Sequence, residues 1–178
     1  MKSKKSASII IILTLLFSLL NLSDLSIAAS NNDVVISEIA WMGTTYSYSD
    51  EWIELYNNTS SDINLNGWTL SSTDGTPSIN LSGTIPANSY FLLERTDDNS
   101  VPSITADLTY SGALGNTAEN LELKDSSGTL VDNLNSWYAG NNSTKATMER
   151  IDNAASGTDA SNWMTATDTY DGGYGTPS

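Results

Sequence analysis

The sequence contains no cysteine and no histidine. Without cysteine the chain can form no disulfide, no thiolate metal site and no thiol nucleophile. Without histidine it lacks the commonest general base and metal ligand, so the hydrolytic triads that depend on histidine are excluded. We therefore predict no catalytic residue, no metal site and no cofactor.

Positive charge is also scarce. Seven lysines and arginines stand against 21 aspartates and glutamates, which gives a net charge of -14. Three of the seven cations are lysines within the first five residues, so the rest of the chain is more acidic still. An acidic surface repels phosphate backbones, and we expect no direct nucleic-acid binding. Such a charge favours solubility outside the cell, and the alternative is attraction of cations or of a basic partner.

The long apolar run lies near the N-terminus. Residues 7–20, ASIIIILTLLFSLL, follow the three lysines, and 14 residues are few for a helix that spans a bilayer. The tripeptide Ser-Ile-Ala that ends at Ala28 places small residues at the two positions that a signal peptidase reads. We predict a signal peptide over residues 1–28, secretion or display at the cell surface, and no membrane span after cleavage. Cleavage after Ala29 and an uncleaved membrane anchor are the alternatives.

The clearest pattern after the apolar run is residues 50–70, DEWIELYNNTSSDINLNGWTL. Ile53 and Leu55 alternate with Trp52, Glu54 and Tyr56, and this period of two indicates a half-buried strand. Residues of the kinds that favour turns follow, and a second alternating run begins at Trp68. We predict two strands joined by a turn, with the ring of Trp68 between two sheets.

The pattern E-W-I-E-L-Y-N-N-(x)-I-x-L-x-G-W-x-L in this stretch resembles the lamin-tail domain, which occurs at the end of nuclear lamins and in many secreted bacterial proteins. The resemblance extends from about Val34 to Leu134 and includes the hairpin with Ser126-Ser127-Gly128 at its turn. It implies an immunoglobulin-like sandwich. In the family this domain often accompanies nucleases, phosphatases or surface proteins, and its own role is mostly inferred to be attachment.

Turn signals divide the chain after the signal into short β segments. We predict an all-β fold, an immunoglobulin-like β-sandwich of seven to nine short antiparallel strands preceded by a signal peptide. The sandwich is expected over residues 34–165, after a short linker at residues 29–33, with its last strand over residues 144–151 and Trp163 packing back onto it. Residues 166–178 are rich in glycine, and we expect a flexible tail or the start of a linker.

The loop over residues 42–49 is the best candidate for ligand binding. It carries Tyr46 and Tyr48 among glycine, threonine and serine, with Trp41 at its base. Tyrosines spaced by serine give a large amphipathic contact area at low entropy cost, as in recognition loops. We predict that these three residues bind an unidentified cell-envelope or extracellular ligand, either protein or glycan. The alternative is that Trp41 caps the core and the tyrosines cover the end of a sheet.

Two carboxylates, Glu38 and Glu54, lie inside apolar strands. A pair of carboxylates is the minimum for glycoside hydrolysis, so a glycoside hydrolase is the remote alternative to a binding domain. The other possibility is that both side chains point out of the sheet, or that one pairs with an arginine. We expect Glu54 to pair with Arg95 or Arg150 across strands.

The sequence thus predicts a secreted, non-catalytic binding or anchoring module at the cell surface, and not an enzyme. A carbohydrate-binding module that uses aromatic rings is one alternative. A calcium-dependent adhesive module is another, because residues 96–100 and 152–162 are rich in oxygen ligands. Neither segment fits the calcium-binding pattern D-x-[DN]-x-[DN]-G with a closing glutamate.

Overall fold

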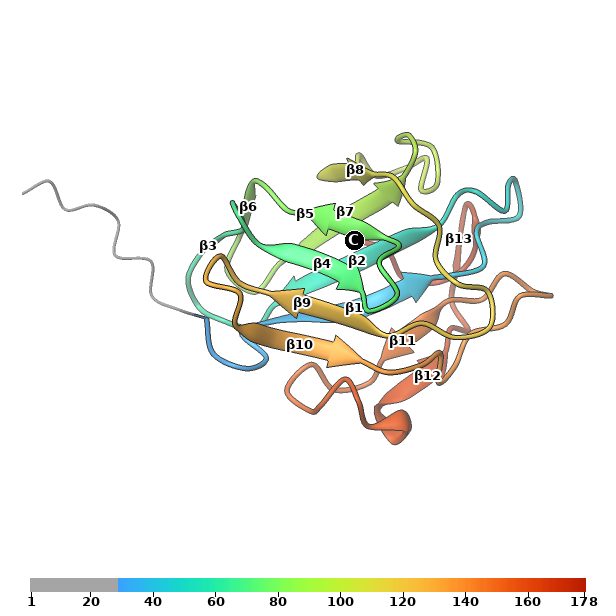
Figure 1. The fold of residues 1–178 in the computed structure, drawn as a ribbon. Coiled ribbons are helices and arrows are strands. Elements are labelled where there is room, and N and C mark those ends of the chain that lie inside the picture. Colours follow the sequence, from blue (N-terminus) through green and yellow to red (C-terminus); the bar gives the residue numbers. More distant parts are fainter. Residues whose placement is uncertain (1–28) are drawn as a thin grey trace, which may run out of the picture.

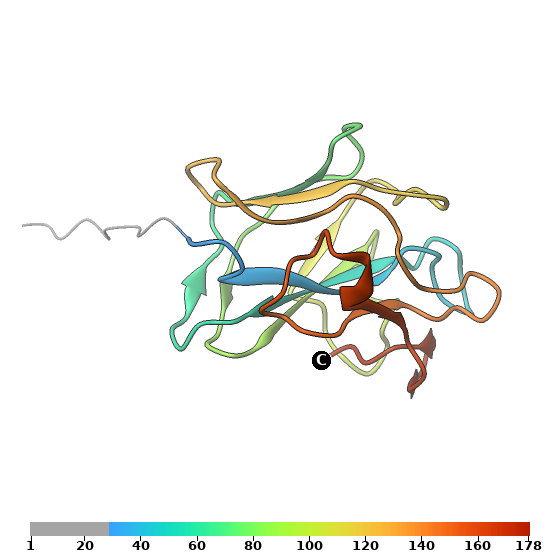
Figure 2. The same ribbon diagram turned by 90° about the horizontal axis from the view of Figure 1, so that it is seen from below.

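The computed structural model describes residues 29–178, and the predicted signal peptide over residues 1–28 lies outside the described residues. Two β-sheets pack face to face (Figures 1 and 2). The larger sheet has the strand order β12 (Trp163–Thr165), β11 (Met148–Arg150), β1 (Val34–Ala40), β2 (Trp52–Asn57), β7 (Tyr90–Arg95) and β8 (Leu108–Tyr110). The smaller sheet has the order β10 (Leu130–Leu134), β9 (Leu121–Lys124), β4 (Thr69–Ser72) and β5 (Ser78–Asn80).

Shorter elements complete the fold. One two-stranded ribbon joins β3 (Ile63–Asn64) to β6 (Thr84–Ile85), and a second joins β13 (Thr169–Tyr170) to β14 (Gly173–Tyr174). A 3-10 turn, η1 (Ala160–Asn162), precedes β12. Among the described residues, none lies in a helix that is long and apolar enough to cross a membrane.

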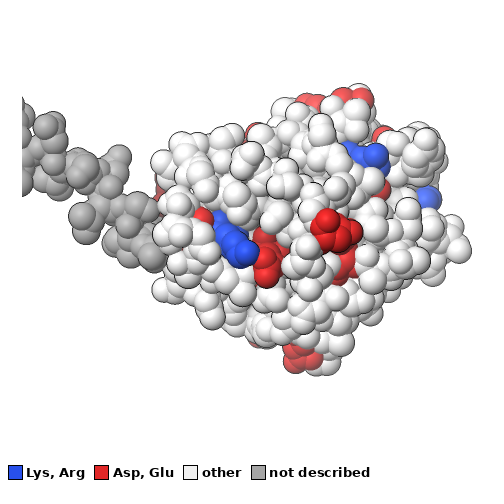
Figure 3. Space-filling model, in the orientation of Figure 1, with Lys and Arg blue, Asp and Glu red and all other residues white. Residues whose placement is uncertain are grey.

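The predicted all-β, immunoglobulin-like sandwich is confirmed. Within residues 29–178 the sandwich has more and shorter strands than the seven to nine expected. The two sheets contain six and four strands, and several neighbouring strands pair over only three residues. The neighbouring strands of both sheets run antiparallel, except that β8 pairs with β7 in parallel. The face of the molecule seen in Figure 3 is mostly uncharged, with a few acidic and basic side chains. Glu122 and Lys124 of β9 in the smaller sheet form an ion pair.

The hydrophobic core lies between the two sheets. Ile53 and Leu55 of β2 belong to it, as their alternation with polar neighbours predicts. Trp68, one residue before β4, is buried in the same core, which confirms its predicted place. Trp163 of β12 is buried there too, beneath the guanidinium of Arg150 at 5.6 Å from the ring centroid.

Strand β1 is buried on both faces, since all seven of its residues are shielded from solvent. Val34 and Ile36 belong to the core between the sheets, whereas Glu38 faces the C-terminal segment. A register irregularity between Ile36 and Glu38 in the pairing with β2 changes the alternation at this point. The dense apolar sequence of this strand therefore reflects cover on two sides.

The C-terminal segment corrects the sequence prediction, because residues 166–178 are not a free tail. Residues 168–178, here named the strap, include the β13–β14 ribbon and lie against the outer face of the larger sheet (Figure 2). Trp52 donates its indole N–H to the Tyr170 hydroxyl at 2.9 Å, and the two rings pack edge to face. Gly173 has a φ of +150°, and a side chain there would collide with the Lys145 carbonyl. Gly173 therefore allows the backbone of the strap to lie close to the backbone of Lys145.

The segment predicted to be the last strand, residues 144–151, is also corrected. Only its second half is a strand, β11, and β12 follows it as the edge of the larger sheet. Residues before β11 form a turn in which Asn141 and Ala146 exchange backbone hydrogen bonds of 2.8 and 3.1 Å. The sandwich therefore continues beyond the point at which the sequence predicts its final strand.

Candidate functional site

The backbone of the loop over residues 42–49 is fixed from within and by the strap. The Thr44 amide donates to the Ser47 carbonyl at 2.9 Å, and the Thr45 amide donates to the Gly172 carbonyl at 2.8 Å. The Thr44 hydroxyl donates to Oδ2 of Asp50 at 2.9 Å. Gly43 has a φ of +72°, in the region that favours glycine. The loop therefore has one well-defined shape.

The two tyrosines of this loop are the most exposed large hydrophobic side chains of the described residues. Tyr46 is 66% exposed and Tyr48 is 81% exposed. The Tyr46 hydroxyl donates to Oδ1 of Asp171 at 2.8 Å, and this hydrogen bond raises the pKa of Tyr46. The structure thus places both predicted contact residues on one exposed loop, and their role in binding stays a prediction.

Trp41 lies beneath this loop. It is 8% exposed, and its ring stacks on Trp137 with 6.1 Å between the centroids and 8° between the planes. Its indole N–H donates to the Ala139 carbonyl at 3.3 Å. Trp41 therefore has the position that the alternative interpretation gives it, at the edge of the core, where it supports the loop.

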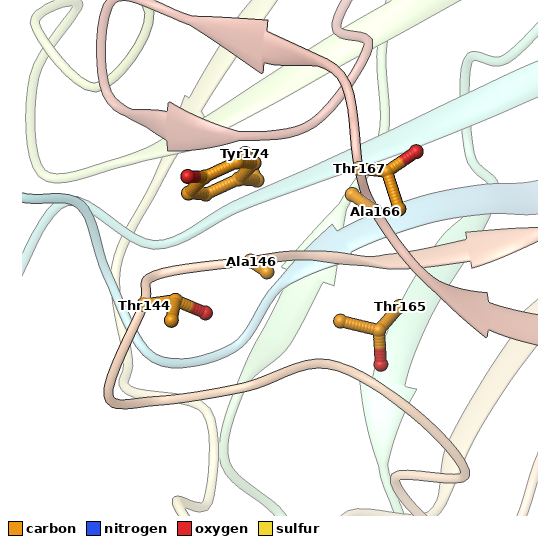
Figure 4. A pocket seen from close by; sticks show the side chains of 6 residues that line it. All are labelled: Thr144, Ala146, Thr165, Ala166, Thr167 and Tyr174. Carbon is orange, nitrogen blue, oxygen red and sulfur yellow. The ribbon is translucent and has the colours of Figure 1, made fainter.

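A shallow pocket of about 230 Å³ opens beside the β13–β14 ribbon (Figure 4). Its lining residues are Thr144, Ala146, Thr165, Ala166, Thr167 and Tyr174. The two alanines are buried, and the threonines and the tyrosine are exposed, so the pocket offers hydroxyl groups and one aromatic ring. Sequence reasoning missed this pocket because three separate segments form it, and two of them extend into the region predicted to be a tail.

The carboxylates of Glu38 and Glu54 come together on the outer face of the larger sheet, beneath the strap. The two residues are directly opposite in the pairing of β1 with β2, and each is 2% exposed. Glu38 accepts hydrogen bonds from the Thr147 hydroxyl at 2.5 Å and from the Thr176 amide at 3.0 Å. Glu54 accepts one from the Ser178 amide at 2.7 Å.

The predicted ion pair of Glu54 with an arginine is wrong. Arg95 is the last residue of β7 and pairs with Glu51, which directly precedes β2, at 3.2 Å. Arg150 turns inward between the sheets and pairs with Asp132 of β10 at 2.6 Å. Glu54 faces the opposite side of the larger sheet from Arg150, so this arginine cannot reach it.

Burial raises the pKa of Glu38 to about 7 and that of Glu54 to about 8. The charge of Glu38 raises the pKa of Glu54 further, while hydrogen bonds from the strap lower both values. In a glycoside hydrolase the sugar must lie between the two carboxyl groups. Here the strap covers the pair, so the structure lacks the open arrangement that this reaction needs.

The two segments with oxygen-rich sequences use their carboxylates locally. Asp152 accepts a hydrogen bond from the Ala154 amide, and Asp159 accepts from the amide and hydroxyl of Ser161 at the start of η1. Asp98 accepts from the Ala106 amide at 2.7 Å. In residues 29–178, no three His, Cys, Asp or Glu side chains are grouped so that they could hold a metal ion.

Two packed sheets with a shared core define an immunoglobulin-like domain. The family model described as Lamin Tail Domain matches residues 27–137, which is more than half of the chain. The chain belongs to the lamin tail domain family, a family of non-enzymatic immunoglobulin-like domains. No curated protein matches it. The matched residues include the loop over residues 42–49 and end before β11, the pocket and the strap.

Proposed function

We propose that this domain is a non-catalytic binding or anchoring module that acts outside the cell, at the cell surface, and that it holds a cell-envelope or extracellular ligand through the loop over residues 42–49. The observation that carries this proposal is the exposure of Tyr46 and Tyr48 on a backbone that hydrogen bonds fix. A loop that is already ordered loses little entropy when it binds. Tyrosine rings then supply contact area with few rotatable bonds.

The proposed location rests on the N-terminal sequence and on charge. Lysines, a 14-residue apolar run and small residues before the cleavage site together have the form of a secretory signal. The acidic composition favours solubility outside the cell and disfavours nucleic-acid partners. Membership of the lamin tail domain family supports attachment as the general role.

The test is attachment of the purified domain to cell-envelope fragments of the organism that produces it. The double variant Tyr46→Ala, Tyr48→Ala should lose most of the attachment and keep its melting midpoint within a few degrees, because exposed loop residues contribute little to stability. Tyr90→Ala is the matched control. Tyr90 is an exposed tyrosine on β7 that pairs with Tyr56, at the far end of β2 from this loop. Equal attachment of both variants would remove the loop from the binding site.

Binding of a carbohydrate in the pocket beside the β13–β14 ribbon, here named the Tyr174 pocket, is the second candidate function. No charged side chain lines the pocket, and its exposed groups are three threonine side chains and one tyrosine ring. The hydroxyl groups of a sugar can form hydrogen bonds with the threonine side chains, and the apolar face of the sugar can pack on the tyrosine ring. The volume of about 230 Å³ is below the usual range of about 300–1,000 Å³ for ligand pockets, so it suits a single sugar ring.

A glycan array and calorimetric titration with the glycans that bind can test this second function. Tyr174→Ala should abolish binding, whereas Tyr48→Ala, at an exposed tyrosine that does not line the pocket, should leave it intact. The reverse result would assign the glycan to the loop. If the unchanged protein binds no glycan, the carbohydrate proposal is wrong and binding through the loop is the one candidate function that stays.

A further inference from the structure

We propose that the strap is a cover controlled by protons. It stays closed over Glu38 and Glu54 while this pair retains at least one proton, and it detaches from the larger sheet when both carboxyl groups ionise. This inference rests on the arrangement of the two carboxyl groups and does not depend on which ligand the domain binds.

The first support is the position of three carboxyl groups across three neighbouring strands. Glu38 of β1 is opposite Glu54 of β2 on one side and opposite Glu149 of β11 on the other. Side chains at directly opposite positions of antiparallel strands have Cβ atoms about 4.5–5.5 Å apart, and like charges there are destabilising. Two full charges at Glu38 and Glu54 would therefore repel each other in a place that water does not reach.

The second support is that no cation neutralises the pair within the described chain. Each of the four cationic side chains of residues 29–178 is engaged elsewhere. Arg95 binds Glu51, Arg150 binds Asp132, Lys124 binds Glu122, and Lys145 donates to the Met42 carbonyl and to Asn142. The other titratable groups around the pair are Tyr56 of β2, Tyr90 of β7, and Asp168 and Tyr170 of the strap. None of these groups supplies positive charge.

The third support is that the strap itself closes over the carboxyl groups. The Thr176 amide donates to Glu38 and the Ser178 amide donates to Glu54. The Thr176 hydroxyl lies 3.0 Å from Glu38 and 3.2 Å from Glu149, and its one hydrogen can be donated to either carboxyl group. The rest of the strap is held by the Trp52–Tyr170 hydrogen bond, by backbone bonds of Tyr174, and by the hydrogen bonds that Gly172 and Asp171 accept from the loop over residues 42–49. Because the strap lies directly over the two carboxyl groups, its release would let water reach them.

The direction of the response follows from the protonation states. Burial raises the pKa of Glu38 to about 7 and that of Glu54 to about 8, so both are largely protonated at pH 5.5 and both are largely ionised at pH 9. A protonated carboxyl group still accepts hydrogen bonds from the strap amides and carries no charge to be desolvated. The strap is therefore closed at mildly acidic pH and open at alkaline pH.

Release of the strap would change both candidate binding sites. Tyr174 is one wall of the pocket, and the Gly172 carbonyl accepts the hydrogen bond of Thr45 that helps to fix the loop over residues 42–49. Opening would also uncover the ring of Trp52, which Tyr170 covers. The ring of Trp52, which is buried while the strap is closed, would then be exposed to solvent on the outer face of the larger sheet.

The experiment is carbon-detected nuclear magnetic resonance of the purified chain between pH 5.5 and pH 9. The side-chain carboxyl carbons of Glu38 and Glu54 report their ionisation, and backbone relaxation at residues 172–178 reports the mobility of the strap. We expect strap order parameters of about 0.85 at pH 5.5 and below about 0.6 at pH 9, while β2 and β7 stay rigid. The change in mobility should follow the titration of the two carboxyl groups.

The double variant Glu38→Gln, Glu54→Gln should keep the strap rigid throughout this pH range, because amides cannot ionise. If this variant does not fold, Glu54→Gln alone, which leaves at most one charge in the pair, must keep the strap rigid. Glu51→Gln is the control, since Glu51 is buried and has a raised pKa but bonds to Arg95 and Leu114. It should leave the opening unchanged. A version extended by Gly-Ser beyond Ser178 removes any effect of a carboxylate at that residue.

Several results would overturn the proposal. One is a strap that stays rigid at pH 9 in the unchanged protein, and another is a strap that is already mobile at pH 5.5. A third is opening of the double glutamine variant over the same pH range, because the carboxyl groups would then not be its cause. None of these results bears on attachment through Tyr46 and Tyr48, which is measured separately.

Discussion

Arg150 and Asp132 join the two sheets through a buried ion pair, with 2.6 Å between Nη1 and Oδ2. Arg150 lies on β11 of the larger sheet and Asp132 lies on β10 of the smaller one. Oδ2 of Asp132 also accepts a hydrogen bond from the Ile36 amide, and Arg150 also donates to the Ile36 and Ala155 carbonyls. Each charge therefore depends on the other for its place inside the protein.

Replacement of Arg150 by methionine should lower the free energy of unfolding by about 3–5 kcal/mol, because it leaves the Asp132 carboxylate buried without a partner. Urea denaturation at pH 7 measures this loss. The double variant Arg150→Met, Asp132→Leu should be less destabilised than the sum of the two single variants, since it leaves no lone charge. A loss below about 1 kcal/mol for Arg150→Met would contradict the buried pair.

Trp68→Ala should cost about 3–5 kcal/mol of stability, the usual range when a buried aromatic ring is removed. Denaturation at constant pH provides the measurement. Tyr48→Ala is the control, because the Tyr48 ring is exposed and its removal should change stability by about 0.5 kcal/mol or less. Similar losses for the two variants would show that Trp68 is not part of the core.

The melting midpoint of the whole domain should fall as the pH rises from 5 to 8. Burial raises the pKa of Glu51 to about 7, although Arg95 and the Leu114 amide lower it, and the pKa values of Glu38 and Glu54 are raised as well. The folded protein therefore binds protons more tightly than the unfolded chain, where a glutamate has its ordinary pKa of 4.5. This contribution is complete below pH 4.5 and is lost as the pH rises through about 7 to 8.

Calorimetry of single variants can check the assignment. Glu51→Gln should reduce the fall in the melting midpoint between pH 5 and 8, because it removes one of the groups that release a proton there. Asp74→Asn should leave the fall unchanged, since hydrogen bonds lower the pKa of Asp74 and place its titration below this range. A midpoint that rises with pH would show that the buried carboxyl groups are stabilised as anions.

Gly43→Ala should impair attachment without removing either tyrosine. Gly43 has a φ of +72°, and a Cβ there would lie 2.7 Å from Cα of Tyr48, so the loop must change shape. We expect a fall of about 2–4 °C in the melting midpoint and a loss of attachment close to that of the double tyrosine variant. Gly75→Ala is the matched control. Its φ of +98° gives similar backbone strain, but nothing lies within 4 Å of its Cβ, so attachment should persist.

The sequence predicts the centre of the fold well because that part depends on local alternation. Ile53 and Leu55 face the core and Trp68 is buried, as their spacing indicates. The exposure of Tyr46 and Tyr48 is also predicted by their polar, turn-forming neighbours. In each case the neighbours in the sequence determine which way the side chain points.

The sequence does not reveal contacts between distant segments. Tyr170 and Ser178 contact Trp52 and Glu54 across more than a hundred residues, and the glycine-rich strap has the composition of a linker. The partner of Arg150 depends on which face of the larger sheet packs against the smaller sheet, and no local sequence pattern predicts this. The prediction that Glu54 pairs with an arginine was wrong because it depends on such distant contacts. The Tyr174 pocket was not predicted because distant segments form it.

The family match ends at residue 137, but the protein interior does not. Met148 and Trp163 are buried in the core, and Arg150 neutralises Asp132, which lies inside the matched region. A fusion that carried only residues 27–137 into another protein would deprive Asp132 of its ion-pair partner and leave β1 with an unpaired edge. The unit of this protein that can be moved intact into another protein therefore extends to at least Trp163.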